Sequence, residues 1–163
     1  MDKYFSAKKF DLNSYEDNDR AYRAISSKFK ELTIKQRGED FGIDCDIYLS
    51  EESLNKGEPP IATAELEVKH NWKKQTSFPF TTVNFLAKKE KHIQGSIFPF
   101  WILFNEDCSD ALVMRMDKIL SYPIIDLFCR GVGMDKIRQV PISVGKVGID
   151  VIERYIIEEL SNK

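Results

Sequence analysis

Long apolar runs are missing from this sequence. No stretch approaches the roughly 20 apolar residues that a helix needs to cross a bilayer. The first residues, MDKYFSAKKFDLN, contain no apolar segment of the kind that marks a secretory signal peptide. We therefore expect no membrane partner and a cytoplasmic protein, or one that is otherwise intracellular, such as a nucleoid-associated protein.

Cysteine and histidine are scarce as well. The three cysteines, Cys45, Cys108 and Cys129, are odd in number and far apart, which is not the pattern of a disulfide framework. No CxxC pair is present and the only histidines are His70 and His92, so a zinc site is not expected. The sequence also lacks a glycine-rich phosphate loop and a GxSxG nucleophile elbow, which removes two common signatures of catalytic sites.

The sequence has little net charge. Among 163 residues, 24 Lys and Arg oppose 26 Asp and Glu, so the formal net charge is −2. Proteins that bind nucleic acid through charge alone are usually basic throughout, so this balance argues against that class. What is present is a globular composition, with 42% hydrophobic and 31% charged residues. The length suits a single domain over residues 1–163.

Two segments, 43–49 and 61–72, alternate between apolar and polar residues, which is the pattern of half-buried strands. The polar loop between them, 50–60, contains one glycine and two prolines. Two strands joined in this way most simply form an antiparallel hairpin, so their polar sides would lie next to each other. The apolar sides are expected to consist of Ile43, Cys45, Ile47, Leu49, Ala62, Ala64, Leu66, Val68, His70 and Trp72.

Other elements follow from helical spacing and from apolar runs. The apolar residues of 17–32 recur at helical spacing, and the run 98–105 is typical of a central strand buried on both faces. We further expect a helix or turn at 81–92, a strand at 111–116, a helix at 117–128 interrupted at Pro123, an edge strand at 137–144 and a closing helix from 149 onward. The sequence therefore predicts an α/β (α+β) domain with a mixed central β-sheet flanked by helices, preceded by a short N-terminal arm over 1–14.

The polar sides of the two alternating segments carry the candidate chemistry. Asp44 and Asp46 lie on the first, and Glu65, Glu67 and Lys69 lie on the second. Opposed residues of antiparallel strands lie about 5 Å apart, so these carboxylates would repel each other unless a cation neutralised them. Mg²⁺ prefers oxygen ligands, and a nearby ammonium can stabilise charge that develops on a phosphate. The pattern predicts a phosphodiester-hydrolysing Mg²⁺ site, in which Mn²⁺ would substitute.

A strand aspartate followed by an E-x-K motif on the next strand resembles the PD-(D/E)xK nuclease superfamily. The motif in this chain is Glu67-Val68-Lys69. The resemblance covers residues 17–115 and implies a restriction-endonuclease-like αβββαβ core. Residues 116–163 would then form a C-terminal extension that ends in the closing helix.

The resemblance also implies roles for single residues. Asp44 and/or Asp46 would bind Mg²⁺ together with Glu67, and which aspartate is the primary ligand stays open. Lys69 would position the attacking water or stabilise the transition-state charge. Two residues are candidates for an additional acid: Glu65 and Glu31.

The small net charge hides a segregation along the chain. Nine acids and one lysine fall between Glu39 and Glu67, whereas six lysines and one glutamate fall between Lys69 and His92. Lysines contact phosphates without reading sequence. We predict a nucleic-acid-binding surface, with an ordinary solvated face as the alternative, from Lys73, Lys74, Lys88, Lys89 and Lys91.

These observations together predict a metal-dependent nuclease that hydrolyses phosphodiester bonds of nucleic acid. DNA is the expected partner, and a homodimer is one arrangement that the resemblance suggests. Two alternatives stay open. One is a catalytically inactive nucleic-acid- or protein-binding module on the same fold, and the other is a small acidic interaction protein or DNA mimic. Converging carboxylates would argue against the mimic, and acids spread over an exposed surface would favour it.

Overall fold

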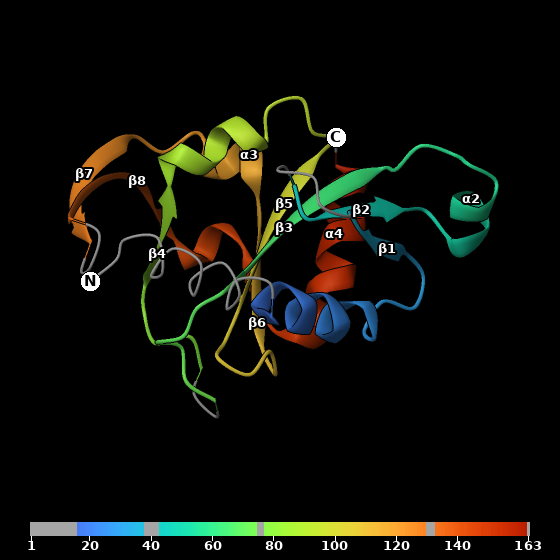
Figure 1. Cartoon of the computed structure of the whole chain (residues 1–163), viewed down its shortest axis with the longest axis horizontal. Coiled ribbons are helices and arrows are strands. Elements are labelled where there is room, and N and C mark those ends of the chain that lie inside the picture. Colours follow the sequence, from blue (N-terminus) through green and yellow to red (C-terminus); the bar gives the residue numbers. More distant parts are fainter. Residues whose placement is uncertain (1–15, 38–42, 75–76, 130–132, 163) are drawn as a thin grey trace, which may run out of the picture.

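Two β-sheets organise the computed structural model, which describes residues 16–37, 43–74, 77–129 and 133–162. The larger sheet has the strand order β1-β2-β3-β5-β6-β9, and the smaller one has the order β4-β8-β7 (Figure 1). The predicted N-terminal arm, 1–14, lies outside the described residues. No helix in this described part of the chain has the length and apolar character needed to cross a membrane.

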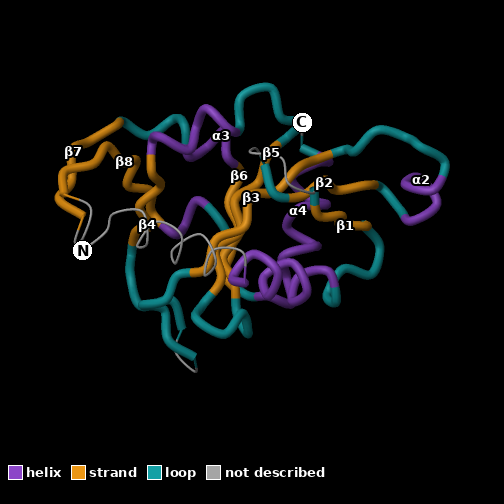
Figure 2. Tube along the Cα trace, in the orientation of Figure 1, coloured by secondary structure: helices purple, strands orange, loops and turns teal. Residues whose placement is uncertain are grey.

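Strands supply most of the regular structure (Figure 2). Those of the larger sheet are β1 (Thr33–Gln36), β2 (Cys45–Tyr48), β3 (Ala62–Val68), β5 (Pro99–Phe104), β6 (Ala111–Arg115) and β9 (Lys146–Val147). Those of the smaller sheet are β4 (Thr82–Leu86), β7 (Ile124–Cys129) and β8 (Gly133–Pro141).

The helices are short apart from one near each end of the described chain. They comprise an N-terminal helix over residues 16–26, α2 (Glu51–Asn55), α3 (Met116–Ile119), α4 (Ile152–Ser161) and the 3₁₀ turns η1 (Ala87–His92), η2 (Ile142–Val144) and η3 (Ile149–Val151). Helices and a mixed sheet together make an α+β fold, so the predicted fold class is confirmed.

The direction of the strands makes the larger sheet mixed. β1, β2 and β3 form an antiparallel meander, β5 runs parallel to β3, and β6 runs antiparallel to β5. The predicted hairpin of the two alternating segments is confirmed, with Cys45 opposite Ala64 and Ile47 opposite Ala62. The predicted central strand is confirmed as β5, which is buried along nearly all of its length.

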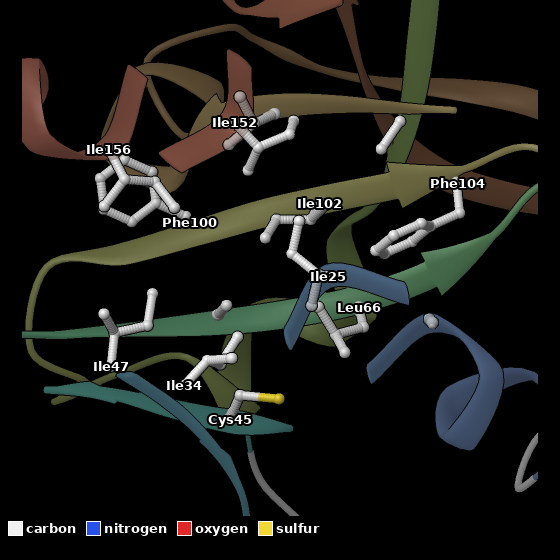
Figure 3. Packing of buried hydrophobic residues seen from close by; sticks show 14 of the residues in the cluster. Ile25, Ile34, Cys45, Ile47, Leu66, Phe100, Ile102, Phe104, Ile152 and Ile156 are labelled. Carbon is white, nitrogen blue, oxygen red and sulfur yellow. The ribbon is translucent and has the colours of Figure 1, made fainter. Parts of the chain in front are cut away.

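The two faces of the larger sheet pack against different hydrophobic cores. Phe100, Ile102 and Phe104 of β5 point into the first core, which also contains residues of the N-terminal helix and α4 (Figure 3). Trp101 and Leu103 point into the second core, with residues of β4, α3 and β8. Side chains alternate between faces along a strand, so one strand serves both cores.

The N-terminal helix is shorter than predicted. The expected helix over 17–32 ends at residue 26, although Ala21 and Ile25 are fully buried as expected. The backbone N–H groups of residues 30–32 all donate to one carboxylate oxygen of Glu153, at 2.9 to 3.0 Å. This carboxylate turns the chain out of the helix and into β1, a strand that the sequence pattern did not reveal.

The segment from 81 to 144 differs most from expectation. Residues 81–92 form β4 and η1, where we expected a helix or turn. The predicted helix at 117–128 is wrong beyond α3, because Pro123 cannot continue a helix and the following β-branched residues favour a strand, β7. The predicted strand at 137–144 is confirmed up to Pro141 as part of β8, but its predicted edge position is wrong, since β8 lies in the middle of the smaller sheet.

Smaller differences occur at the ends of the predicted elements. Leu49 is 61% exposed, because β2 ends at Tyr48. The loop 50–60 contains α2, whose first turn is capped by the Ser50 hydroxyl. His70 and Trp72 lie beyond the end of β3, and Trp72 is buried in the second core. The strand at 111–116 and the closing helix, with Ile152 and Ile156 buried, are confirmed as β6 and α4.

Candidate active site

Asp44 lies immediately before β2, where β2 and β3 begin to separate. One carboxylate oxygen accepts a hydrogen bond from the backbone N–H of Leu66 at 2.7 Å. The other accepts one from the side-chain amide of Asn18, in the N-terminal helix, at 3.2 Å. Asp44 thus replaces a strand carbonyl as the acceptor for Leu66, and the two donors fix the direction of its carboxyl group.

Glu65 of β3 places its carboxyl group against that of Asp44. Burial and then the charge of Asp44 raise the pKa of Glu65 to about 8, while burial raises the pKa of Asp44 to about 6. The two carboxyls are hydrogen bonded to each other, so near neutral pH they share a proton. The Oε2 atom of Glu65 is buried and receives no hydrogen bond from the described residues.

Glu67 lies two residues further along β3, on the same face, and meets a lysine from η1. The ammonium of Lys89 donates to Oε1 of Glu67 at 2.5 Å, and the two side chains are 27% and 31% exposed. Burial acts to lower the pKa of Lys89, but the charges of Glu67, Glu65 and Asp44 raise it above its usual value. The ammonium therefore stays charged among the carboxyl groups.

We refer to Asp44, Glu65, Glu67 and Lys89 as the carboxyl–lysine cluster. Its three carboxyl groups face a single ammonium, and the raised pKa values of Glu65 and Asp44 reflect the burial of these groups and the crowding of their negative charges. An unbalanced charge that is partly buried is unfavourable, because the protein interior solvates it poorly. An additional positive charge would therefore stabilise the cluster.

Asp46, the second candidate aspartate, has a counter-ion of its own. Its two carboxylate oxygens accept hydrogen bonds from Nε and Nη2 of Arg37, at 3.0 and 2.8 Å. Such a paired guanidinium geometry is among the strongest ion pairs that side chains form. The structure places Asp46 in a link between the end of β1 and β2, while Asp44 lies in the cluster.

Lys69, the lysine of the E-x-K motif, follows β3 directly. Its ammonium lies over the ring of Phe80, 5.2 Å from the ring centroid, in a cation–π arrangement. Lys69 and Glu67 both line a cavity of about 200 Å³ between the two sheets, together with Asn84 and Trp101. Lys69 thus borders the cluster, but it is Lys89 that contacts Glu67.

Glu31 lies away from the cluster. Its backbone N–H donates to Glu153 of α4, and α4 covers the opposite face of the larger sheet. Its own side chain is exposed. The structure therefore does not bring this candidate acid together with Asp44 and Glu67.

The basic stretch is divided between the two ends of β4. Before β4, Lys73 and Lys74 pair with Glu106 and Asp107, at 3.1 and 3.9 Å. After β4, Lys88 pairs with Asp135 at 3.5 Å. Lys91 is exposed, and Lys89 belongs to the cluster. Most of the lysines predicted to contact nucleic acid are thus held by neighbouring acids.

The oxygen atoms of the three carboxyl groups in the cluster are ligands that suit a hard divalent cation. One of these atoms, Oε2 of Glu65, receives no hydrogen bond from the described residues. Within residues 16–37, 43–74, 77–129 and 133–162, however, no three His, Cys, Asp or Glu side chains are arranged so as to hold a metal ion. The carboxylate of Glu67 instead faces the ammonium of Lys89. No family model, curated protein or solved structure matches the chain.

Proposed function

We propose that this protein is a metal-dependent nuclease that hydrolyses phosphodiester bonds, with DNA as its substrate. One observation carries the proposal: carboxyl groups from the ends of two adjacent strands converge with an ammonium, and their charges do not balance. Groups with strongly shifted pKa values that gather in one place are typical of functional sites. Asp44, Glu65 and Glu67 would supply the oxygen ligands for Mg²⁺ or Mn²⁺.

The arrangement of the strands supports the same proposal. The N-terminal helix, the β1–β2–β3 meander and the parallel strand β5 follow the order that the PD-(D/E)xK resemblance implies. β4 and η1 stand in the place of the second helix of that order. The candidate acids lie at the β2–β3 pair, where the resemblance expects them.

Each acid of the cluster has a defined part in this proposal. Asp44 would act as a fixed ligand, because Leu66 and Asn18 already orient its carboxyl group. Glu65 would give up the proton that it shares with Asp44, and Glu67 would turn from Lys89 toward the cation. When bound, the cation supplies polarisation of the scissile phosphate and a water of lowered pKa. Lys69, beside Glu67 on the cavity wall, stays a candidate for orienting that water.

A cleavage assay tests the proposal. Plasmid, linear, single-stranded and branched DNA, and RNA, would be incubated with Mg²⁺, Mn²⁺ or EDTA. We expect cleavage only with a divalent cation, and a loss of about 100-fold or more in Glu67→Gln and Glu65→Gln, as is usual when a charge-stabilising group is removed from an active site. Glu52→Gln, which changes an exposed acid of α2 outside the cluster, is the matched control. Cleavage that survives both cluster substitutions would contradict the proposal.

A second candidate function has a specific observation in its favour. Because Lys89 already pairs with Glu67, the cluster can be stable without a metal, as expected for a catalytically inactive nucleic-acid- or protein-binding module. Calorimetric titration with Mn²⁺ separates the two candidates. The nuclease should show a binding site that Glu67→Gln abolishes, whereas the module should show no such site.

The nuclease proposal also defines the setting of the protein. Its partner would be nucleic acid in the cytoplasm or at the nucleoid. Lys91 would contact phosphates directly, and Lys73, Lys74 and Lys88 would do so after releasing the acids with which they pair. A homodimer is part of the proposal because the resemblance suggests it, and two sites would let one assembly cut both DNA strands. Size-exclusion chromatography with light scattering would test it, and a purely monomeric active enzyme would contradict it.

A further inference from the structure

We infer that Lys89, rather than the lysine of the E-x-K motif, provides the ammonium of this active site. The inference rests on the proposed nuclease function and deepens it by naming a positioning residue. Lys89 lies in a different element from the three acids, and 22 residues separate it from Glu67 in the sequence. It approaches them from η1, across the face of the sheet that carries Glu65 and Glu67.

The contacts of the two lysines separate their roles. Nζ of Lys89 lies 2.5 Å from the Glu67 carboxylate, and its charge also acts on Glu65 and Asp44. Nζ of Lys69 instead lies over the ring of Phe80, which is 41% exposed. An ammonium acts on a reacting phosphate only from close range in a site shielded from water. Lys89, whose side chain is 27% exposed, meets the condition of close range through its contact with a candidate ligand.

The turn that carries Lys89 is firmly anchored. The neighbouring residue in η1, Glu90, accepts hydrogen bonds from Nε and Nη2 of Arg138 in β8, at 2.5 and 3.4 Å. Arg138 also donates to the backbone carbonyls of Leu120 and Tyr122. Just before η1, Leu86 pairs with Ile137 across β4 and β8. An active-site side chain needs this kind of rigid support to act with a defined geometry.

The role of Lys89 follows from what it touches. Its ammonium donates to Glu67, whose side chain lines the 200 Å³ cavity. With a cation bound, Lys89 would steady the Glu67 side chain as a ligand and offset the negative charge gathered there. Lys89 is therefore a positioning residue that acts through Glu67. Its loss should lower kcat more than it changes KM.

Kinetics of four variants test this inference. Lys89→Ala should lower kcat by about 100-fold or more with a change in KM below about threefold, because the lost interaction is made in the transition state. Lys89→Arg, which keeps the charge, should recover at least tenfold of that loss, and added ethylammonium should partly restore Lys89→Ala. Lys69→Ala should lower kcat less than Lys89→Ala does, and Lys56→Ala, which changes an exposed lysine just after α2, is the matched control and should stay within threefold of the original kcat.

The outcomes distinguish this inference from the proposed function. A large loss of kcat in Lys69→Ala, with Lys89→Ala nearly unaffected, would overturn the role of Lys89 alone and leave the nuclease intact. A protein that cleaves none of the substrates would overturn the proposed function, and the role of Lys89 with it. Melting temperatures are compared throughout. If Lys89→Ala is poorly folded, kcat is compared between Lys89→Arg and Lys69→Arg instead. Equal kcat values in these two variants would contradict the role of Lys89.

Discussion

Asp44 and Asp46 lie two residues apart on the same side of one strand, yet their surroundings differ. Asp46 is matched by the guanidinium of Arg37, which satisfies both of its oxygens. Asp44 is held by the neutral donors of Leu66 and Asn18 and shares a proton with Glu65. A charged side chain with its own counter-ion needs no further partner. Two buried carboxyl groups that lie against each other repel, and a bound cation would lower that electrostatic energy. The contrast explains why we assign the chemistry to Asp44.

The largest expected effect is on cleavage. Asp44→Asn should reduce cleavage by about 100-fold or more, while Asp46→Asn should change it by less than about threefold, because only the first removes charge from the cluster. The measurement is the metal-dependent rate on the best DNA substrate. Both variants keep an acceptor oxygen, so they form a matched pair. An equal loss in both would show that Asp46 is a ligand too.

The next largest effect is on stability. Lys89→Met should lower the free energy of unfolding by about 2 kcal/mol, because it leaves three carboxyl groups without a cation in a partly buried site. Arg37→Met should cost about 1 kcal/mol or less, since it leaves a single carboxylate, that of Asp46, without its counter-ion. Urea unfolding at pH 7 measures both. A larger loss in Arg37→Met would reverse the comparison.

The smallest effect is a change in pH dependence. The pKa of Glu65 is raised to about 8 in the folded protein, so the folded state holds more protons than the unfolded state between its ordinary value of 4.5 and 8. Stability should therefore fall as pH rises through this window, and the raised pKa of Asp44 acts in the same direction. Glu65→Gln should flatten the slope, as measured by urea unfolding at pH 5, 6.5 and 8.5. Asp46→Asn should keep the original slope, and a Glu65→Gln profile parallel to the original would contradict the shared proton.

The sequence predicted the part of the site that depends on one strand pair. Strict alternation placed Asp44, Glu65 and Glu67 on polar sides, and the hairpin brought them together. The sequence did not predict the pairing of Asp46 with Arg37. β1 is four residues long and buries only Ile34 fully, and so short a pattern cannot be recognised as a strand.

Lys89 was recognised only as one of several lysines. The run Lys88-Lys89-Glu90-Lys91 offers three lysines of equal chemistry, and no local signal separates them. Which of these lysines reaches Glu67 depends on the tight 3₁₀ turn of η1 and on the pairing of β4 with β8. A local sequence pattern predicts neither of these features. Because the pairing of β4 with β8 is not visible in the local sequence, the pattern of 81–92 predicts a helix or turn where β4 and η1 form.

The carboxylate of Glu153 has a consequence for how the protein is made. It binds three consecutive backbone N–H groups at residues 30–32, and the helix that carries it places Ile152 and Ile156 in the first core beside Ala21 and Ile25. During synthesis residues 30–32 therefore leave the ribosome about 120 residues before the carboxylate that binds them. The turn that leads into the edge strand β1 cannot be fixed in this way until α4 has been made.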